Sequence, residues 1–176
     1  TFQRDVELFN SYLMNRDDSS VGALEQGLFI RKHTDAELQN DVTFVISPFC
    51  SHCLEVVVQL KKRSIENFNV RLLLSAKFDP MSPSPSQLVG SVLIGIYIQN
   101  GWDSFLEAYI ELHTISNKKE WYDSNRMFQS DTSNRVLMNQ NEFLRSHHIS
   151  ISPVSFFQNK MIGTPYSAVD VFHFLS

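Results

Sequence analysis

Hydrophobic and polar positions follow one another in blocks that predict strands and helices in a definite order. Apolar residues three and four apart over residues 4–14 predict a helix, and residues 28–30 predict a short strand. The β-rich runs at residues 43–47 and 70–74 are typical of buried strands. Residues 51–65 between them have helical spacing and end in a basic cluster, which suits the negative end of a helix dipole. Strand, helix and strand in this order indicate a βαβ unit.

The second half of the chain predicts a helical block followed by a hairpin. Apolar positions in residues 86–147 recur mostly every three or four, which indicates several consecutive helices. Two short apolar runs, residues 155–157 and 160–162, are separated by two residues and predict a β-hairpin. Residues 167–175, with Ser167 as N-cap, predict a closing helix.

Composition narrows the functions that such a chain can have. Its 176 residues are 43% hydrophobic and 12% aromatic, which predicts a packed globular core. The 15 basic and 19 acidic residues give a net charge of −4, so we expect no nucleic-acid partner held by bulk charge. The long apolar run at residues 88–98 is far shorter than the roughly 20 residues of a membrane-spanning helix. It is therefore expected to be a core element.

The two cysteines lie in one tetrapeptide, Cys50-Ser51-His52-Cys53, where the first strong strand gives way to a helix. A helix N-terminus presents unpaired N–H groups and a partial positive charge, both of which stabilise a thiolate, the reactive form of cysteine. We therefore predict that Cys50 is a nucleophile and that Cys53, one turn further on, is the resolving thiol. A protonated His52 would further favour the thiolate and make the oxidised pair a better electron acceptor.

Other uses of the cysteine pair stay open at this point. A zinc site needs two further ligands, and the histidines are scattered along the chain. His147 and His148 are adjacent, but neighbouring residues on a helix point about 100° apart and chelate one ion poorly. We expect no metal and no cofactor. The alternative is a non-catalytic binding module with a structural disulfide or a metal at the pair, in which His52 is only an exposed turn residue.

Three segments resemble the thioredoxin superfamily. They are the strand at residues 43–47 that runs into the cysteine pair, the segment Ile151-Ser152-Pro153-Val154 with the phenylalanines after it, and the hairpin with its final helix. The 100 residues between Cys53 and Pro153 leave room for a helical insertion, as in DsbA-like members. The resemblance implies an α/β thioredoxin-like fold in which a central mixed sheet is flanked by helices.

The resemblance also implies a domain organisation. Residues 41–176 would form the thioredoxin-like domain, with the helical insertion at about 86–147 between the βαβ half and the C-terminal ββα half. Residues 1–40 would be an N-terminal extension that contains a helix and a strand.

The same resemblance assigns further site residues. It implies a cis peptide bond between Ser152 and Pro153 that faces the cysteine pair, and X-Pro bonds adopt cis far more readily than others. Ser152, Val154 and Phe49 are expected to contact substrate, although core packing is the alternative for Phe49. Phe44 stands where thioredoxin and DsbA-like proteins have a buried acid, six residues before Cys50, so the proton acceptor for Cys53 is unassigned.

The implied activity is that of a thiol–disulfide oxidoreductase acting on protein thiols and disulfides, in the oxidising direction. The Pro-Phe-Cys start of the motif and the Ser-Pro loop at residues 79–85 further resemble a bacterial group. In that group a thioredoxin-like domain is appended to a membrane protein of the vitamin K epoxide reductase type. This implies a periplasmic, membrane-tethered location and a quinone-linked redox partner or fused membrane domain. The chain begins with Thr1 rather than Met, as expected for a fragment of a longer protein.

Overall fold

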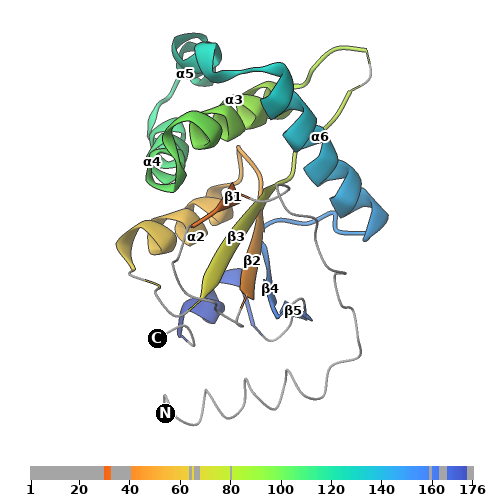
Figure 1. Cartoon of the computed structure of the whole chain (residues 1–176). Helices are drawn as coiled ribbons and strands as arrows, with labels where there is room; N and C mark the ends of the chain where they lie inside the picture. Colours follow the sequence, from red (N-terminus) through yellow and green to blue (C-terminus); the bar gives the residue numbers. More distant parts are fainter. Residues whose placement is uncertain are drawn as a thin grey trace.

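The computed structural model describes residues 30–32, 41–63, 65, 68–79, 81–158, 160–162 and 166–173. Its strands are β1 (Ile30–Arg31), β2 (Asp41–Ile46), β3 (Asn69–Leu74), β4 (Val154–Phe157) and β5 (Lys160–Ile162). Its helices are α2 (Ser51–Lys62), α3 (Pro85–Asn100), α4 (Trp102–Thr114), α5 (Lys118–Asn125) and α6 (Asp131–Ser146), with 3₁₀ helices η1 (Arg126–Phe128) and η2 (Ala168–His173) (Figure 1). The helix predicted over residues 4–14 lies outside the described residues.

The strands form one mixed sheet in the order β1-β3-β2-β4-β5. β2 and β3 are parallel, with Val42 opposite Val70, and α2 connects them as the predicted βαβ unit requires. β4 runs antiparallel to β2, with Val154 opposite Val45, and forms a hairpin with β5. The predicted fold class, a mixed sheet flanked by helices with a helical insertion, is confirmed.

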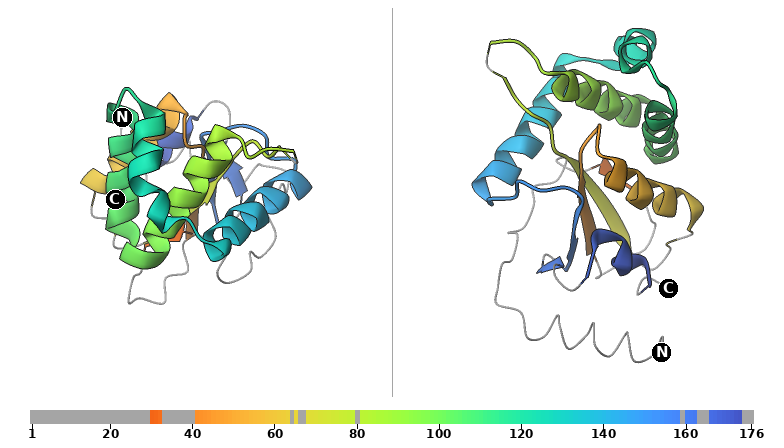
Figure 2. Two further views of the ribbon diagram at one scale, coloured as in Figure 1. Left: turned by 90° about the horizontal axis from the view of Figure 1, so that it is seen from above. Right: turned by 180° about the vertical axis from the view of Figure 1, so that it is seen from behind.

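The sheet separates two cores because successive side chains of a strand point to opposite faces. Phe44 and Ile46 of β2 belong to the larger core with α2 and the insertion. Val45, between them, packs in a smaller core with Leu144 of α6 and Phe156 of β4. α2 and α6 accordingly cover opposite faces of the sheet (Figure 2).

The insertion is built around α3, whose residues 89–96 are all buried. Such a helix is apolar on every side because α4, α5, η1 and α6 all pack against it. Gly95 allows the closest of these contacts, since a Cβ there would lie 1.8 Å from the carbonyl oxygen of Phe128 in η1. The insertion lies over the end of the sheet at which the loop between β2 and α2 emerges (Figure 1).

Two element boundaries differ from the sequence prediction. The closing segment is the 3₁₀ helix η2, not the α-helix predicted over residues 167–175. Its first turn closes between Asp170 N–H and the carbonyl of Ser167 at 3.1 Å, and Asp170 Oδ2 accepts from Ser167 N–H at 2.6 Å. The backbone bond spans three residues, which is the spacing of a 3₁₀ turn, and the side-chain bond is that of a capping box. α2 ends at Lys62 rather than Ile65, because Arg63 is extended and caps the helix with its N–H on the Gln59 carbonyl.

In the part of the chain that the structure describes, no helix combines the length and the apolar character needed to cross a bilayer.

Candidate active site

Cys50 and Cys53 lie at the start of α2, after the turn that follows β2. Cys50 is the N-cap of α2, and its Sγ accepts a hydrogen bond of 3.2 Å from the Cys53 N–H. Cys50 N–H in turn donates to the Ser47 carbonyl at 3.4 Å, which closes the turn before the helix. Cys50 is half-buried and Cys53 is fully buried. The outer sulfur is therefore the accessible one, and the inner sulfur is enclosed by the protein.

Burial changes the chemistry of Cys53. Loss of solvent raises the pKa of its thiol to about 12, and the hydrogen bond and charge of Cys50 raise it as well. The backbone of Ser47 and the side chain of Ser152 act in the opposite direction and stabilise the thiolate. At neutral pH Cys53 therefore holds its proton, and any step that leaves a negative charge on this sulfur depends on nearby hydrogen-bond donors.

The segment before β4 reaches the cysteine pair from the far end of the sequence. The Ser152–Pro153 peptide bond is cis. The Cys50 thiol donates to the Ser152 carbonyl at 3.7 Å, and the hydroxyl oxygens of Ser152 and Ser47 are 3.0 Å apart. Ser152 and Pro153 thus lie at the cysteine pair, across more than 100 residues of sequence.

The remaining site residues of the sequence prediction divide into two groups. Ser51 and His52 are exposed on the first turn of α2, and Phe49 beside them is 42% exposed rather than packed in the core. The Val154 side chain is buried in the smaller core. β4 pairs with β2, and this pairing places the Val154 side chain on the face of the sheet that α6 covers. With its side chain buried, Val154 would contact substrate through its backbone, and the contact of Val154 with substrate stays a prediction.

Sequence reasoning missed one group of site residues, which comes from the insertion. The Tyr109 hydroxyl of α4 donates a 2.6 Å hydrogen bond to the Ser47 carbonyl, the same oxygen that accepts from Cys50 N–H. The His113 ring lies 4.7 Å from the Tyr109 ring, centroid to centroid. Helical spacing marked Tyr109 only as a core position. The one signal of a polar role is His113 four residues later on the same helix face.

Similarity to known proteins is found among solved structures. No family model and no curated protein matches the chain. Among solved structures, oxidised BdbD from Bacillus subtilis matches with a TM-score of 0.63 and 11% identity over 90% of this chain and 97% of that one. The thiol-disulfide exchange protein α-DsbA2 from Wolbachia pipientis gives 0.60 and 8% over 98% and 96%. A periplasmic thioredoxin-like protein from Salmonella enterica serovar Typhimurium gives 0.61 and 10% over 83% and 88%.

The chain has a DsbA-like thioredoxin fold. At these identities the likeness concerns the fold, and it confirms what the cysteine motif and the long separation from Pro153 predicted. In this DsbA-like fold the residue six positions before Cys50 is Phe44. Its ring is fully buried and stacks on Phe172 of η2, with centroids 5.2 Å apart and planes at 10°. β2 therefore offers a hydrocarbon ring, not a carboxylate, to the core that contains Cys53.

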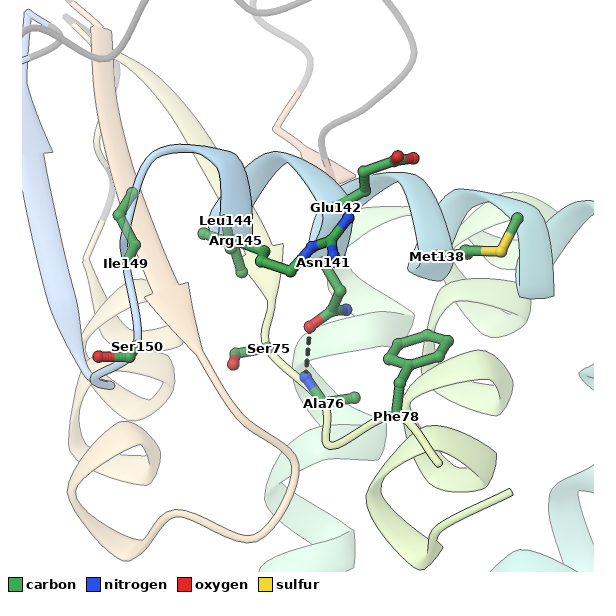
Figure 3. Close-up of a pocket in the computed structure, with 10 residues that line it drawn as sticks. All are labelled: Ser75, Ala76, Phe78, Met138, Asn141, Glu142, Leu144, Arg145, Ile149 and Ser150. Atoms are coloured by element: carbon green, nitrogen blue, oxygen red, sulfur yellow. Dashed lines mark hydrogen bonds between the residues drawn. The ribbon is translucent and has the colours of Figure 1, made fainter. Parts of the chain in front are cut away.

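This protein also has a hollow on the face of the sheet that α6 covers. It has a volume of about 580 Å³ and opens between α6, the residues after β3 and residues 149–150 (Figure 3). Phe78 and Met138, both partly exposed, lie at one end, and Ile149 and Ser150 lie at the other. Asn141 fixes the wall between them by accepting the Ala76 N–H at 2.8 Å. The hollow thus adjoins the segment that leads into Ser152.

No group of three or more histidine, cysteine, aspartate or glutamate side chains gathers to hold a metal ion among the residues that the structure describes.

Proposed function

We propose that this protein is a thiol–disulfide oxidoreductase that acts on protein thiols through Cys50 and Cys53. One observation carries the proposal: a half-exposed sulfur caps a helix N-terminus and is backed by a fully buried second sulfur. The accessible Cys50 sulfur suits attack by, or on, a second molecule. The enclosed Cys53 sulfur suits intramolecular resolution, because bulky partners cannot reach it.

The reaction follows thiol–disulfide exchange chemistry. In the oxidised protein a client thiolate attacks Cys50 Sγ, the Cys50–Cys53 bond breaks, and its electron pair stays on Cys53, which then takes up a proton. A second client thiolate attacks the client sulfur of the mixed disulfide and releases the Cys50 thiolate. The client gains one disulfide and loses two electrons, and the protein gains both electrons as two thiols. The reverse sequence would reduce a client disulfide.

We propose the oxidising direction. The Cys53 N–H donates to Cys50 Sγ and thereby stabilises the charged sulfur of the reduced state, and a stabilised reduced state makes a stronger oxidant. His52, exposed beside the pair, would add to this effect when protonated. Exposed Phe49 and the backbone of Ser152 would contact the client polypeptide.

Continued oxidation requires an acceptor for the two electrons of the reduced pair. We propose a quinone-linked membrane protein, fused to this domain or separate from it, in an extracytoplasmic compartment. The membrane protein is proposed from the sequence resemblance alone, and two considerations support the extracytoplasmic compartment. Disulfides persist in oxidising compartments, and the structurally similar Salmonella protein is described as periplasmic.

Equilibration with glutathione tests the proposal. We expect the Cys50–Cys53 pair to move between a disulfide and two thiols per chain as the ratio of oxidised to reduced glutathione changes. Thiol titration and intact mass measure the two forms. A pair that resists both glutathione and dithiol reagents, or native protein with stoichiometric zinc, would instead indicate a non-catalytic binding module.

A further inference from the structure

We propose that Tyr109, supplied by the helical insertion, is a positioning residue for the Cys50–Cys53 pair that holds the turn before the cysteines and donates its hydroxyl hydrogen to Cys53 when that sulfur becomes a thiolate. The inference rests on the proposed function and names the group that stabilises its leaving sulfur. It concerns a residue that binds the turn before the reacting cysteines from a part of the chain outside the βαβ unit.

Ser47 is the point at which three segments meet. Its carbonyl accepts from Tyr109 Oη at 2.6 Å and from Cys50 N–H at 3.4 Å. Its hydroxyl oxygen is 3.0 Å from the Ser152 hydroxyl oxygen. Since the Ser152 carbonyl accepts from the Cys50 thiol, α4, the cysteine turn and the cis-proline segment form one connected set of hydrogen bonds.

The Tyr109 hydroxyl can serve two acceptors in turn. A phenol has one hydrogen to donate, and in this structure the Tyr109 hydroxyl donates it to the Ser47 carbonyl. Ser47, whose carbonyl holds this hydroxyl, also hydrogen-bonds through its backbone to Cys53, and the side chain of Cys53 is itself among the causes that raise the pKa of Tyr109. When the disulfide opens and charge appears on Cys53, a rotation about the C–O bond moves the hydrogen to the thiolate. The Ser47 carbonyl keeps its bond from Cys50 N–H in the meantime.

The surroundings keep Tyr109 a donor. Its side chain is fully buried, and burial raises the pKa of its hydroxyl well above the ordinary value, with further increases from the charges of Cys53 and Cys50. His113, whose ring is tilted against that of Tyr109, is kept neutral, because burial and then the charge of Lys118 lower the pKa of the imidazole. Tyr109 therefore neither ionises nor faces a cation, and hydrogen bonding is the contribution it can make.

This contribution matters because Cys53 is an unfavourable place for charge. Burial is the largest cause of its raised pKa, and Phe44 on β2 supplies no polar group. A donor aimed at a buried anion is worth more than one in water, since the surrounding medium stabilises the charge poorly. A donor on α4 would favour the transition state in which Cys53 leaves as a thiolate.

Tyr109→Phe tests the inference, because it removes the hydroxyl and keeps the buried ring. We expect opening of the oxidised pair by a small thiol to slow about tenfold, the loss expected for one hydrogen bond to a charged group. We expect the glutathione equilibrium to stay nearly unchanged at neutral pH, because Cys53 is a protonated thiol in the reduced pair. Tyr97→Phe is the matched control. The hydroxyl of Tyr97 in α3 also hydrogen-bonds to backbone, but its partner is the backbone of Arg31.

The outcomes separate positioning from packing. In a Cys53→Ala background the attack of Cys50 on an external disulfide should be insensitive to Tyr109→Phe, because no charge develops at position 53 for the hydroxyl to stabilise. An unchanged opening rate in Tyr109→Phe would overturn the inference, as would an equal loss of rate in Tyr97→Phe. If the wild-type pair itself does not equilibrate with glutathione, the proposed function fails, whatever the tyrosine variants do.

Discussion

A Cys53→Ala variant is expected to stay covalently joined to a disulfide-bonded client, whereas Cys50→Ala is expected to form no adduct and to lose all exchange activity. Cys50 is the half-exposed sulfur at the start of α2, so it is the one that can attack a client disulfide. The mixed disulfide normally breaks when Cys53 attacks Cys50. Without Cys53 that intramolecular step is missing, and the adduct can resolve only by attack from outside.

Non-reducing electrophoresis and intact mass would detect the adduct as one protein plus one client, released by dithiothreitol. Both variants should remain folded, because each removes only one sulfur atom. Urea unfolding of the reduced proteins checks this and should show a loss of about 1–2 kcal/mol for buried Cys53→Ala. An adduct on Cys50→Ala but not on Cys53→Ala would reverse the two assigned roles.

Gly95→Ala is expected to lower the free energy of unfolding by about 1–3 kcal/mol, as overpacking of a tight core does. The new Cβ would lie 1.8 Å from the carbonyl oxygen and 2.7 Å from the carbonyl carbon of Phe128. These are backbone atoms, so no side-chain rotation relieves the overlap, and η1 must move away from α3. The insertion that carries Tyr109 would be loosened as a result.

Gly90→Ala on the same helix is the matched control. Its Cβ would lie 3.2 Å from the terminal methyl carbons of Leu137, which can rotate, and alanine is the better helix former by about 1 kcal/mol. We therefore expect Gly90→Ala to be close to neutral in urea unfolding. Equal stability of the two variants would show that η1 does not press on α3 as the structure has it.

The local pattern of hydrophobic and polar residues predicted much of the fold. The β-rich run before Cys50, the helical spacing after it and the next apolar run predicted β2, α2 and β3, since each pattern reports which side chains are buried. The position of Cys50 at a strand–helix junction predicted that it lies at a helix N-terminus, where the structure makes it the N-cap of α2. The 3₁₀ winding at Ala168–His173 was not predictable, because α-helical and 3₁₀ turns bury nearly the same residues in so short a segment.

Contacts between distant segments account for what the sequence could not predict. The bond from Tyr109 to Ser47 spans 62 residues and depends on how α4 packs on the cysteine turn, which helical spacing does not encode. The buried position of the Val154 side chain has a related cause. The two-residue period of a strand places Val154 and Ser155 on opposite faces, but which face α6 covers is decided by tertiary packing.

Disulfide transfer to a protein client tests the central claim most directly. Oxidised protein would be mixed with an unfolded, reduced client that has two cysteines, and the thiols on each chain would be counted over time. We predict that each disulfide formed in the client is matched by two new thiols on the protein, at Cys50 and Cys53, and that Cys50→Ala transfers none. A client that stays reduced beside fully oxidised protein, or a client that oxidises equally well with Cys50→Ala, would contradict the account.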